Sequence, residues 1–296
     1  MRSVVVVNLT LLFIAFVWGF GFVPQRLGMD FMGPNAFNAL RFACGALTLL
    51  PLLFFIQSIG WRDVRPDATL SLGLVLGVLL FGGAAFQQMS IQYTKLANVA
   101  FITGLYVIIV PLIAYFLGYR YKLVVWIGGV LAIVGMYLMN DLSNEISLKG
   151  DILALIGAVF WAIHLLVLSE KAGNHKQLLL AFYQFAFCAL FSLVLALAIE
   201  PAGVPTDMAS LTWPLVNGVL VVGIAYTLQV WVMEHAEPFL ASLILALEAV
   251  FGALFGYFVF DEVLFIWGLI GAGLMLFGCL LAQLPGTQSK SSDSAS

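Results

Sequence analysis

The chain has 296 residues, of which 63% are hydrophobic and 9% are Asp, Glu, Lys or Arg, and its formal net charge is −3. Soluble domains carry about 25% charged residues, so 12 basic and 15 acidic side chains are too few to cover a water-exposed surface of this size. The composition therefore excludes an ordinary soluble enzyme and predicts a protein solvated by lipid. Neither sign of charge gathers in a block, which argues against a nucleic-acid partner.

Apolar runs of about 20 residues, the length of a membrane-spanning helix, follow one another along almost the whole chain. We expect an all-α polytopic membrane protein with ten spans, at 4–24, 35–56, 69–90, 97–117, 122–140, 151–169, 178–199, 213–233, 239–258 and 264–283. The linkers are too short for an extramembrane domain. Residues 284–296 are rich in Ser, with Gly and Pro, and we expect a disordered cytoplasmic tail there.

The basic residues favour one orientation of these spans. If the N-terminus is cytoplasmic, eight basic residues lie in inside segments and three in outside loops. The inside set is Arg2, Arg62, Arg65, Arg120, Lys122, Lys171, Lys176 and Lys290, and the outside set is Arg26, Lys95 and Lys149. Positive loops stay in the cytoplasm, so we expect both termini there. A bacterial inner membrane fits this count, and an organelle remains an alternative.

The chain also repeats itself at offsets of 141–143 residues. The matches are Phe16–Gly19 with Val159–Ala162, Arg41 and Phe42 with Gln184 and Phe185, Gly82–Gln88 with Gly223–Gln229, and Gly128 and Gly135 with Gly271 and Gly278. They predict two five-helix units, at 1–140 and 150–283. Five is an odd number of spans, so the second unit must cross in the opposite sense. Inverted repeats of this kind are typical of secondary transporters, whose substrate site lies where the repeats meet.

Several residues at their places in this pattern resemble a known family. They are Trp18–Phe22 in the first span, Arg41 in the second, Ala100–Tyr106 in the fourth, and Ala241, Ser242 and Glu248 in the ninth, followed by Asp261 and Glu262. Over about residues 4–283 the chain resembles EamA-type members of the drug/metabolite transporter superfamily. Two positions depart from the family pattern: Ala249 stands where Pro is common, and Tyr119 and Arg120 stand where an acidic residue is common.

This resemblance implies a permease that moves a small metabolite across the membrane by alternating access, often as efflux of amino acids or their relatives. It implies neither a cofactor nor a metal, and it leaves the substrate and the oligomeric state open. Two other classes remain as alternatives: an intramembrane transferase acting on a lipid or sugar donor, and a passive channel. The chain has no P-loop motif for ATP and no histidine or cysteine spacing typical of a metal site.

Glu248 is the first candidate for the site. It lies about nine residues into its span, near mid-membrane, and at helical spacing it shares a face with Ala241, Gly252 and Gly256. Small residues face protein rather than lipid, so we expect Glu248 to point into the bundle. A carboxylate there is costly unless it is protonated, paired or wetted. We therefore expect a cavity around it, with proton coupling as a hypothesis and a structural hydrogen bond as the alternative.

Arg41 is the second candidate. Asn38 precedes it by one turn, and Cys44, Gly45 and Thr48 continue the same polar and small stripe. A buried arginine there can bind a substrate carboxylate through two parallel hydrogen bonds. The alternative is that its long side chain reaches the outer membrane interface.

Further candidates occupy matched positions in the two halves, which converge in an inverted repeat. These are Gln88 with Gln229, Tyr106 with Glu248, and Trp18 with Trp161. His164 joins them because a histidine facing the cavity can share a proton with a carboxylate. Packing in the bundle is the alternative for each of these residues. Pro111, inside the fourth span, predicts a bend.

Overall fold

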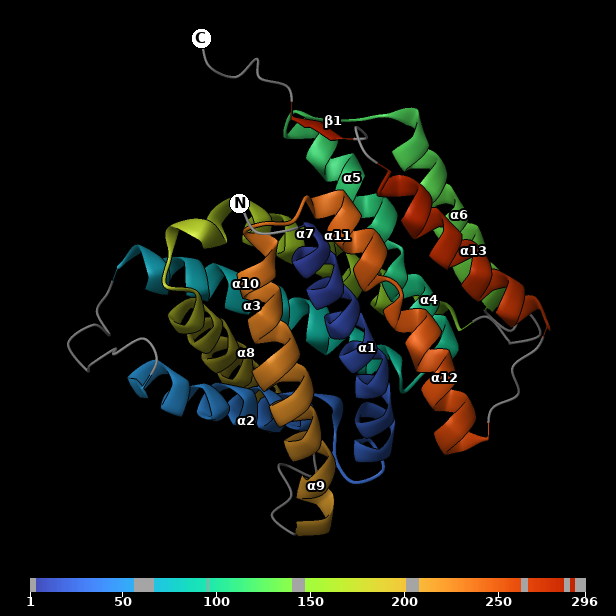
Figure 1. Cartoon of the computed structure of the whole chain (residues 1–296). Helices are drawn as coiled ribbons and strands as arrows, with labels where there is room; N and C mark the ends of the chain where they lie inside the picture. The colour runs from blue at the N-terminus through green and yellow to red at the C-terminus, as the bar shows by residue number, and fades with distance from the viewer. Residues whose placement is uncertain are drawn as a thin grey trace.

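The computed structural model describes residues 4–55, 67–94, 96–139, 147–200, 208–261, 266–284 and 288–290, and it is almost entirely helical (Figure 1). Arg2, Arg62, Arg65 and Lys95, on which the predicted orientation partly rests, lie outside these ranges. The first half contains α1 (Val4–Gly28), α2 (Pro34–Phe55), α3 (Ala68–Ser90), α4 (Leu96–Gly104), α5 (Tyr106–Phe116), β1 (Tyr119–Tyr121) and α6 (Leu123–Met139).

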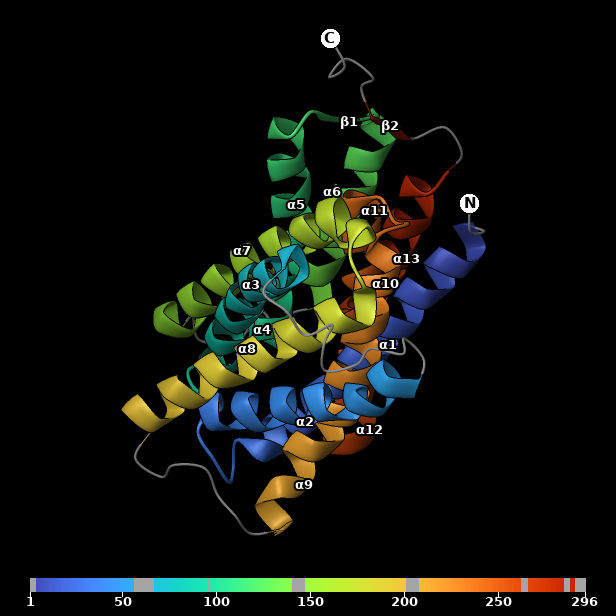
Figure 2. The same cartoon turned by 90° about the vertical axis from the view of Figure 1, so that its left-hand side faces the viewer.

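The second half begins at α7 and ends in a short strand. Its elements are α7 (Leu148–Lys171), the 3-10 turn η2 (Ala172–Asn174), α8 (Gln177–Ile199), α9 (Met208–Asn217), the π-helix η3 (Gly218–Tyr226), α10 (Thr227–Met233), α11 (Pro238–Leu245), α12 (Glu248–Phe260), α13 (Ile266–Ala282) and β2 (Gln288–Lys290). Figures 1 and 2 place β1 and the C-terminus at one end of the molecule and α9 at the other.

Within the described part of the chain, eight helical segments are long and apolar enough to cross a membrane. The two remaining apolar helices, α6 and α13, have 17 residues each and occupy the fifth and tenth expected spans. Large apolar side chains such as Phe55, Phe116 and Phe258 are exposed on the outside, where lipid replaces water as the solvent. These are the features of a polytopic helical membrane protein.

Local signals in the sequence set where several of the helices begin. The side chain of Asp67 accepts the main-chain N–H of Leu70 at 2.9 Å and caps α3. The carboxylate of Glu237 accepts the N–H groups of Phe239 at 3.1 Å and Leu240 at 2.9 Å, and Pro238 stands at the first position of α11. The helix ends at these loops are therefore satisfied by side chains rather than left open.

The expected spans 97–117 and 239–258 are not continuous helices, because each is interrupted near its middle. The breaks fall between α4 and α5 and between α11 and α12. At the first, the N–H of Leu105 donates to the carbonyl of Ile102 at 3.1 Å; at the second, Leu247 donates to Ile244 at 3.1 Å. Both bonds run to the third preceding residue and tighten the turn, and the two turns stand 142 residues apart. Pro111, where we expected the bend, lies inside α5.

The fifth and tenth expected spans pack against each other through glycines (Figures 1 and 2). A Cβ atom on Gly128 would lie 2.6 Å from the carbonyl oxygen of Gly278, and one on Gly278 would lie 2.5 Å from that of Gly128. Gly135 and Gly271 form a second reciprocal contact of the same kind. Residue 128 therefore faces 278 and residue 135 faces 271, so α6 and α13 run antiparallel. Helix α2 likewise packs against its counterpart α8.

The strand β2 lies in the segment expected to be a disordered tail. It pairs antiparallel with β1, with Tyr119 opposite Lys290 and Tyr121 opposite Gln288. The prediction therefore differs from the structure at 288–290, because β1 offers unpaired main-chain groups that a neighbouring segment can bond. Residues 285–287 and 291–296 lie outside the described ranges.

Candidate functional site

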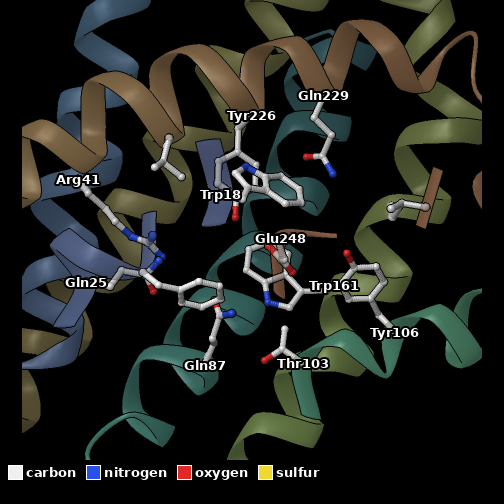
Figure 3. Close-up of a pocket in the computed structure, with 13 residues that line it drawn as sticks. Trp18, Gln25, Arg41, Gln87, Thr103, Tyr106, Trp161, Tyr226, Gln229 and Glu248 are labelled. Carbon is white, nitrogen blue, oxygen red and sulfur yellow. The ribbon is translucent and has the colours of Figure 1, made fainter. Parts of the chain in front are cut away.

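A cavity of about 500 Å³ lies between helices of the two halves (Figure 3). Ligand pockets usually enclose about 300–1,000 Å³, so this space suits a small molecule. The lining residues are Trp18, Phe22, Gln25, Arg41, Gln87, Thr103, Tyr106, Trp161, Leu165, Val221, Tyr226, Gln229 and Glu248. Seven come from the first half and six from the second.

Equivalent positions of the two halves meet on the cavity wall. Trp18 on α1 and Trp161 on α7 stand 143 residues apart, as do Phe22 and Leu165. Tyr106 and Glu248 are the first residues of α5 and α12, directly after the two interruptions. The interruptions therefore place the start of a helix at the cavity from each half.

Glu248 projects into the middle of the cavity in Figure 3. It is 7% exposed, and no hydrogen bond or ion pair joins its carboxylate to any residue that the structure describes. Its place at the first turn of α12 favours a negative charge, because the helix dipole is positive there. Ala241, expected on the same helical face, lies on the separate helix α11. The break at 246–247 thus gives Glu248 an orientation that a continuous helix would not.

Arg41 reaches the cavity from α2 and is 1% exposed. Its Nε donates to Oδ1 of Asn38 at 2.8 Å, and its Nη1 donates to Oδ1 of Asn217 at 3.3 Å. Its Nη2 has no hydrogen-bond partner among the described residues. The guanidinium carbon lies 4.7 Å from the ring centre of Phe42, an arrangement that partly offsets the burial of the charge. Arg41 is thus held inside the bundle and does not reach the membrane interface.

Three aromatic rings form one wall of the cavity. The ring of Tyr226 lies 4.9 Å from that of Trp18 and 5.9 Å from that of Trp161, and it is within 19° of parallel with the second. The stack joins α1, η3 and α7. It offers a flat apolar surface with polar edges, suited to a planar or apolar part of a solute.

The wall also carries polar atoms that lack a protein partner in the described part of the chain. They are Trp18 Nε1, Gln25 Oε1, Arg41 Nη2, Thr103 Oγ1, Tyr106 OH, Trp161 Nε1 and Gln229 Oε1. Buried polar groups in native proteins are nearly always hydrogen-bonded to protein, water or ligand. Seven such atoms around one space indicate that water or a polar solute occupies it.

Six of the nine residues proposed from the sequence line this cavity: Trp18, Arg41, Tyr106, Trp161, Gln229 and Glu248. The other three lie behind the wall. Asn38 holds Arg41, the Nε2 of Gln88 donates to the main-chain oxygen of Gln25 at 3.4 Å, and the Nε2 of His164 lies 2.9 Å from Oε1 of Gln184. For His164, the packing alternative describes what the structure shows, since it is fully buried against Trp161 and Gln184.

Sequence reasoning missed seven lining residues: Phe22, Gln25, Gln87, Thr103, Leu165, Val221 and Tyr226. For Gln87 the reason is a shift in register. We paired Gln88 with Gln229 at an offset of 141, but Gln87 is the cavity residue, at an offset of 142. The π-helix η3 precedes Gln229, and a π turn takes one residue more than an α turn. The interval to Tyr106 and Glu248, also 142, was the available signal.

At the end of the molecule that carries β1, two tyrosines join the halves. The hydroxyl of Tyr119 donates to Oε1 of Glu170 on α7, and that of Tyr121 donates to Oε1 of Glu237 at 2.7 Å. Burial raises the pKa of Glu237 above its ordinary value, although its hydrogen bonds oppose the shift. Burial and the neighbouring glutamates raise the pKa of both tyrosines, so they remain hydrogen-bond donors at neutral pH.

Comparison with known proteins gives consistent matches along the whole chain. The model of the EamA-like transporter family matches residues 6–141 and again 148–284. An uncharacterized transporter of Archaeoglobus fulgidus is 29% identical over 285 residues, which cover 94% of this chain and 85% of the relative. The uncharacterized transporter YoaV of Bacillus subtilis is 26% identical over 285 residues, covering 93% and 96%. A crystal structure with 18% identity shares the fold, with a TM-score of 0.81 over 96% of this chain and 99% of the other.

Proposed function

Because the chain belongs to the EamA-like transporter family, we propose that this membrane transporter is a secondary active carrier of a small metabolite. The observation that carries the proposal is the cavity. Both halves build its wall, it has the volume of a ligand site, and seven of its polar atoms lack partners among the described residues. In this proposal the solute binds there and the two halves rock around it, opening the cavity to one side of the membrane at a time.

The arrangement of the helices supports an inverted repeat of two five-helix units, 1–140 and 150–283. Units of opposite sense are related by a two-fold axis, which makes equivalent helices meet antiparallel with reciprocal contacts. The glycine contacts of α6 with α13, the pairing of α2 with α8, and the two matched interruptions all have this form. Ten spans follow if α6 and α13 also cross the bilayer. In the proposed orientation both termini are cytoplasmic, in a bacterial inner membrane.

The chemistry of the cavity supports a solute with a flat or apolar part and a charged group. The Trp18–Tyr226–Trp161 stack supplies the apolar surface, and Arg41 supplies a positive charge. Amino acids, related organic anions and drug-like compounds have this combination, and we propose efflux as the direction. Protons are the proposed coupling ion, because Glu248 is a carboxylate in the cavity without a bond to a described residue.

A metabolite comparison of cells with and without overproduction of the protein identifies a solute to label, and counterflow in liposomes then tests the function. A carrier gives saturable counterflow, with labelled solute accumulating against unlabelled solute inside. Unsaturable conductance would instead indicate a channel, and covalent turnover of a lipid or sugar donor would indicate a transferase.

The coupling role of Glu248 is tested with the same liposomes under an imposed pH gradient. Glu248→Gln keeps the shape of the side chain but cannot ionise, so we expect exchange to continue while the pH gradient no longer drives accumulation. Glu234→Gln, at an exposed glutamate outside the cavity, is the matched control. Accumulation by Glu248→Gln that still follows the pH gradient would reject proton coupling through this residue.

A further inference from the structure

The anchoring of Arg41 determines what charge the cavity presents to a solute. Arg41 is 1% exposed, and in the described part of the chain no carboxylate forms an ion pair with it. Two of its nitrogens are held by side-chain amides, Asn38 and Asn217, and Nη2 has no described partner. An amide oxygen fixes the guanidinium in place without neutralising it, so the positive charge stays available inside the cavity.

The orientation of both amides is fixed from behind. The Nδ2 of Asn38 donates to the main-chain oxygen of Ala84 at 3.1 Å, and the Nδ2 of Asn217 donates to that of Gly21 at 3.1 Å. Each amide nitrogen is thereby committed to a carbonyl, so each amide oxygen must face Arg41. The set joins α1, α2, α3 and α9, and holds the guanidinium against four helices of both halves.

The other ionisable group of the cavity does not compensate this charge. Figure 3 shows Arg41 beside Gln25 on one side, while Glu248 lies apart in the middle of the cavity. A buried charge without a counter-charge is costly. A solute carboxylate that contacts Nη2 supplies both the missing counter-charge and the missing hydrogen bond.

We propose that Asn217 is a positioning residue that keeps Arg41 uncompensated, and that the site therefore selects solutes with a carboxylate over their neutral amides. This inference rests on the proposed function and narrows its substrate class. Asn38 has the same role at Nε, but Asn217 comes from the opposite half and from the residue directly before the π-helix. It thus links the anion site to the segment that carries Val221 and Tyr226.

The test uses the purified full chain and calorimetric binding of matched pairs: benzoate with benzamide, and phenylacetate with phenylacetamide. The wild type should bind each acid at least about tenfold more tightly than its amide, as expected for a charge-assisted hydrogen bond. Asn217→Asp places a carboxylate next to Arg41. It should weaken the acids about tenfold or more and leave the amides within about twofold, because the internal ion pair replaces the ligand's.

Asn38→Asp is the second variant, with the same expected loss of acid preference if Asn217→Asp does not fold. Asn98→Asp is the control, since Asn98 is a buried asparagine on α4 outside the cavity wall, bonded to Thr94. It should leave the ratio of acid to amide affinity unchanged. A merely structural role for Asn217 would weaken acids and amides equally, and that result would overturn the proposal.

A wild type without preference for the acids would overturn it as well, whatever the variants do. The outcome is separable from the transport proposal. Carboxylate selectivity without counterflow would leave this site standing and reject the carrier, whereas saturable counterflow without carboxylate preference would do the reverse.

Discussion

Arg41 and Glu248 carry opposite charges in one cavity, yet no ion pair joins them. Most buried charges in proteins are paired, since removing one from water is costly. Here the arginine is held by neutral amides, and the glutamate stands at the start of a helix. A solute, water or a proton must therefore complete each group, which is the property that a transport site needs.

Arg41→Lys tests the geometry of the arginine rather than its charge. A lysine keeps one positive charge but lacks the planar fork that reaches Asn38 and Asn217 together. We expect a folded protein whose transport of carboxylate solutes falls about tenfold or more, measured as initial counterflow rates. Arg26→Lys, outside the cavity wall at the end of α1, is the control and should transport at nearly the wild-type rate. An unchanged rate in Arg41→Lys would separate this residue from solute binding.

Candidates at this scale were predictable where residue type and repeat position agreed. Ionisable groups inside a span, such as Arg41 and Glu248, and the matched pair Trp18 and Trp161 all line the cavity. Tyr226 was not predictable, because its first-half equivalent is Ala85 at an offset of 141 and gives no matched aromatic. Gln87 was hidden by the extra residue of the π-helix.

At the scale of elements, helix length and type were predictable from apolar runs, whereas the interruptions were not. The segments before and after Leu105 and Leu247 are uniformly apolar, and the backbone of both residues stays in the right-handed helical region. Only the hydrogen-bond partner changes there, from the fourth to the third preceding residue. A hydropathy pattern contains no sign of such a change.

The glycine contacts of α6 and α13 give a prediction about stability. In Gly278→Ala the new methyl would lie 2.5 Å from the carbonyl oxygen of Gly128, so the helices must separate. Overpacking of this kind costs about 1–3 kcal/mol, and we expect a lower thermal unfolding midpoint in detergent. Gly273→Ala, on the same helix with nothing within 4 Å of the new Cβ, should be neutral or slightly stabilising. Equal effects of the two changes would contradict the glycine interface.

The contact of Tyr121 with Glu237 gives a prediction about pH. Because the folded protein raises the pKa of Glu237 above the ordinary value of 4.5, it holds that proton more tightly than the unfolded chain does. The free energy of unfolding must then decrease as pH rises from about 4.5 through the folded pKa. Glu237→Gln cannot ionise and should lose this decrease, which unfolding midpoints across acidic pH would measure.

Two comparisons make the pH test specific. Tyr121→Phe removes the hydroxyl that stabilises the ionised carboxylate, so it should steepen the decrease or extend it to higher pH. Glu234→Gln, at an exposed glutamate near the same loop, should keep the wild-type dependence. If Glu237→Gln and the wild type respond identically to pH, the carboxylate of Glu237 is not the group responsible.

For the whole molecule, the inverted repeat predicts on which side of the membrane equivalent residues lie. Phe31 and Asn174 are exposed, follow the first helix of each half and stand 143 residues apart. In a background without native cysteines, Phe31→Cys and Asn174→Cys should be labelled from opposite faces of sealed vesicles by an impermeant thiol reagent. Labelling of both from the same face would mean that the halves are threaded in parallel.

The central claim, that both sides of the membrane reach this cavity, is tested most directly at Thr103. This residue is 2% exposed on the cavity wall, with a hydroxyl that lacks a described partner. With Cys44, Cys188 and Cys279 replaced, Thr103→Cys should react with an impermeant thiol reagent added to either face, while lipid-facing Phe258→Cys reacts from neither. Protection of position 103 from both faces, or access from one face only under every gradient imposed, would contradict the account.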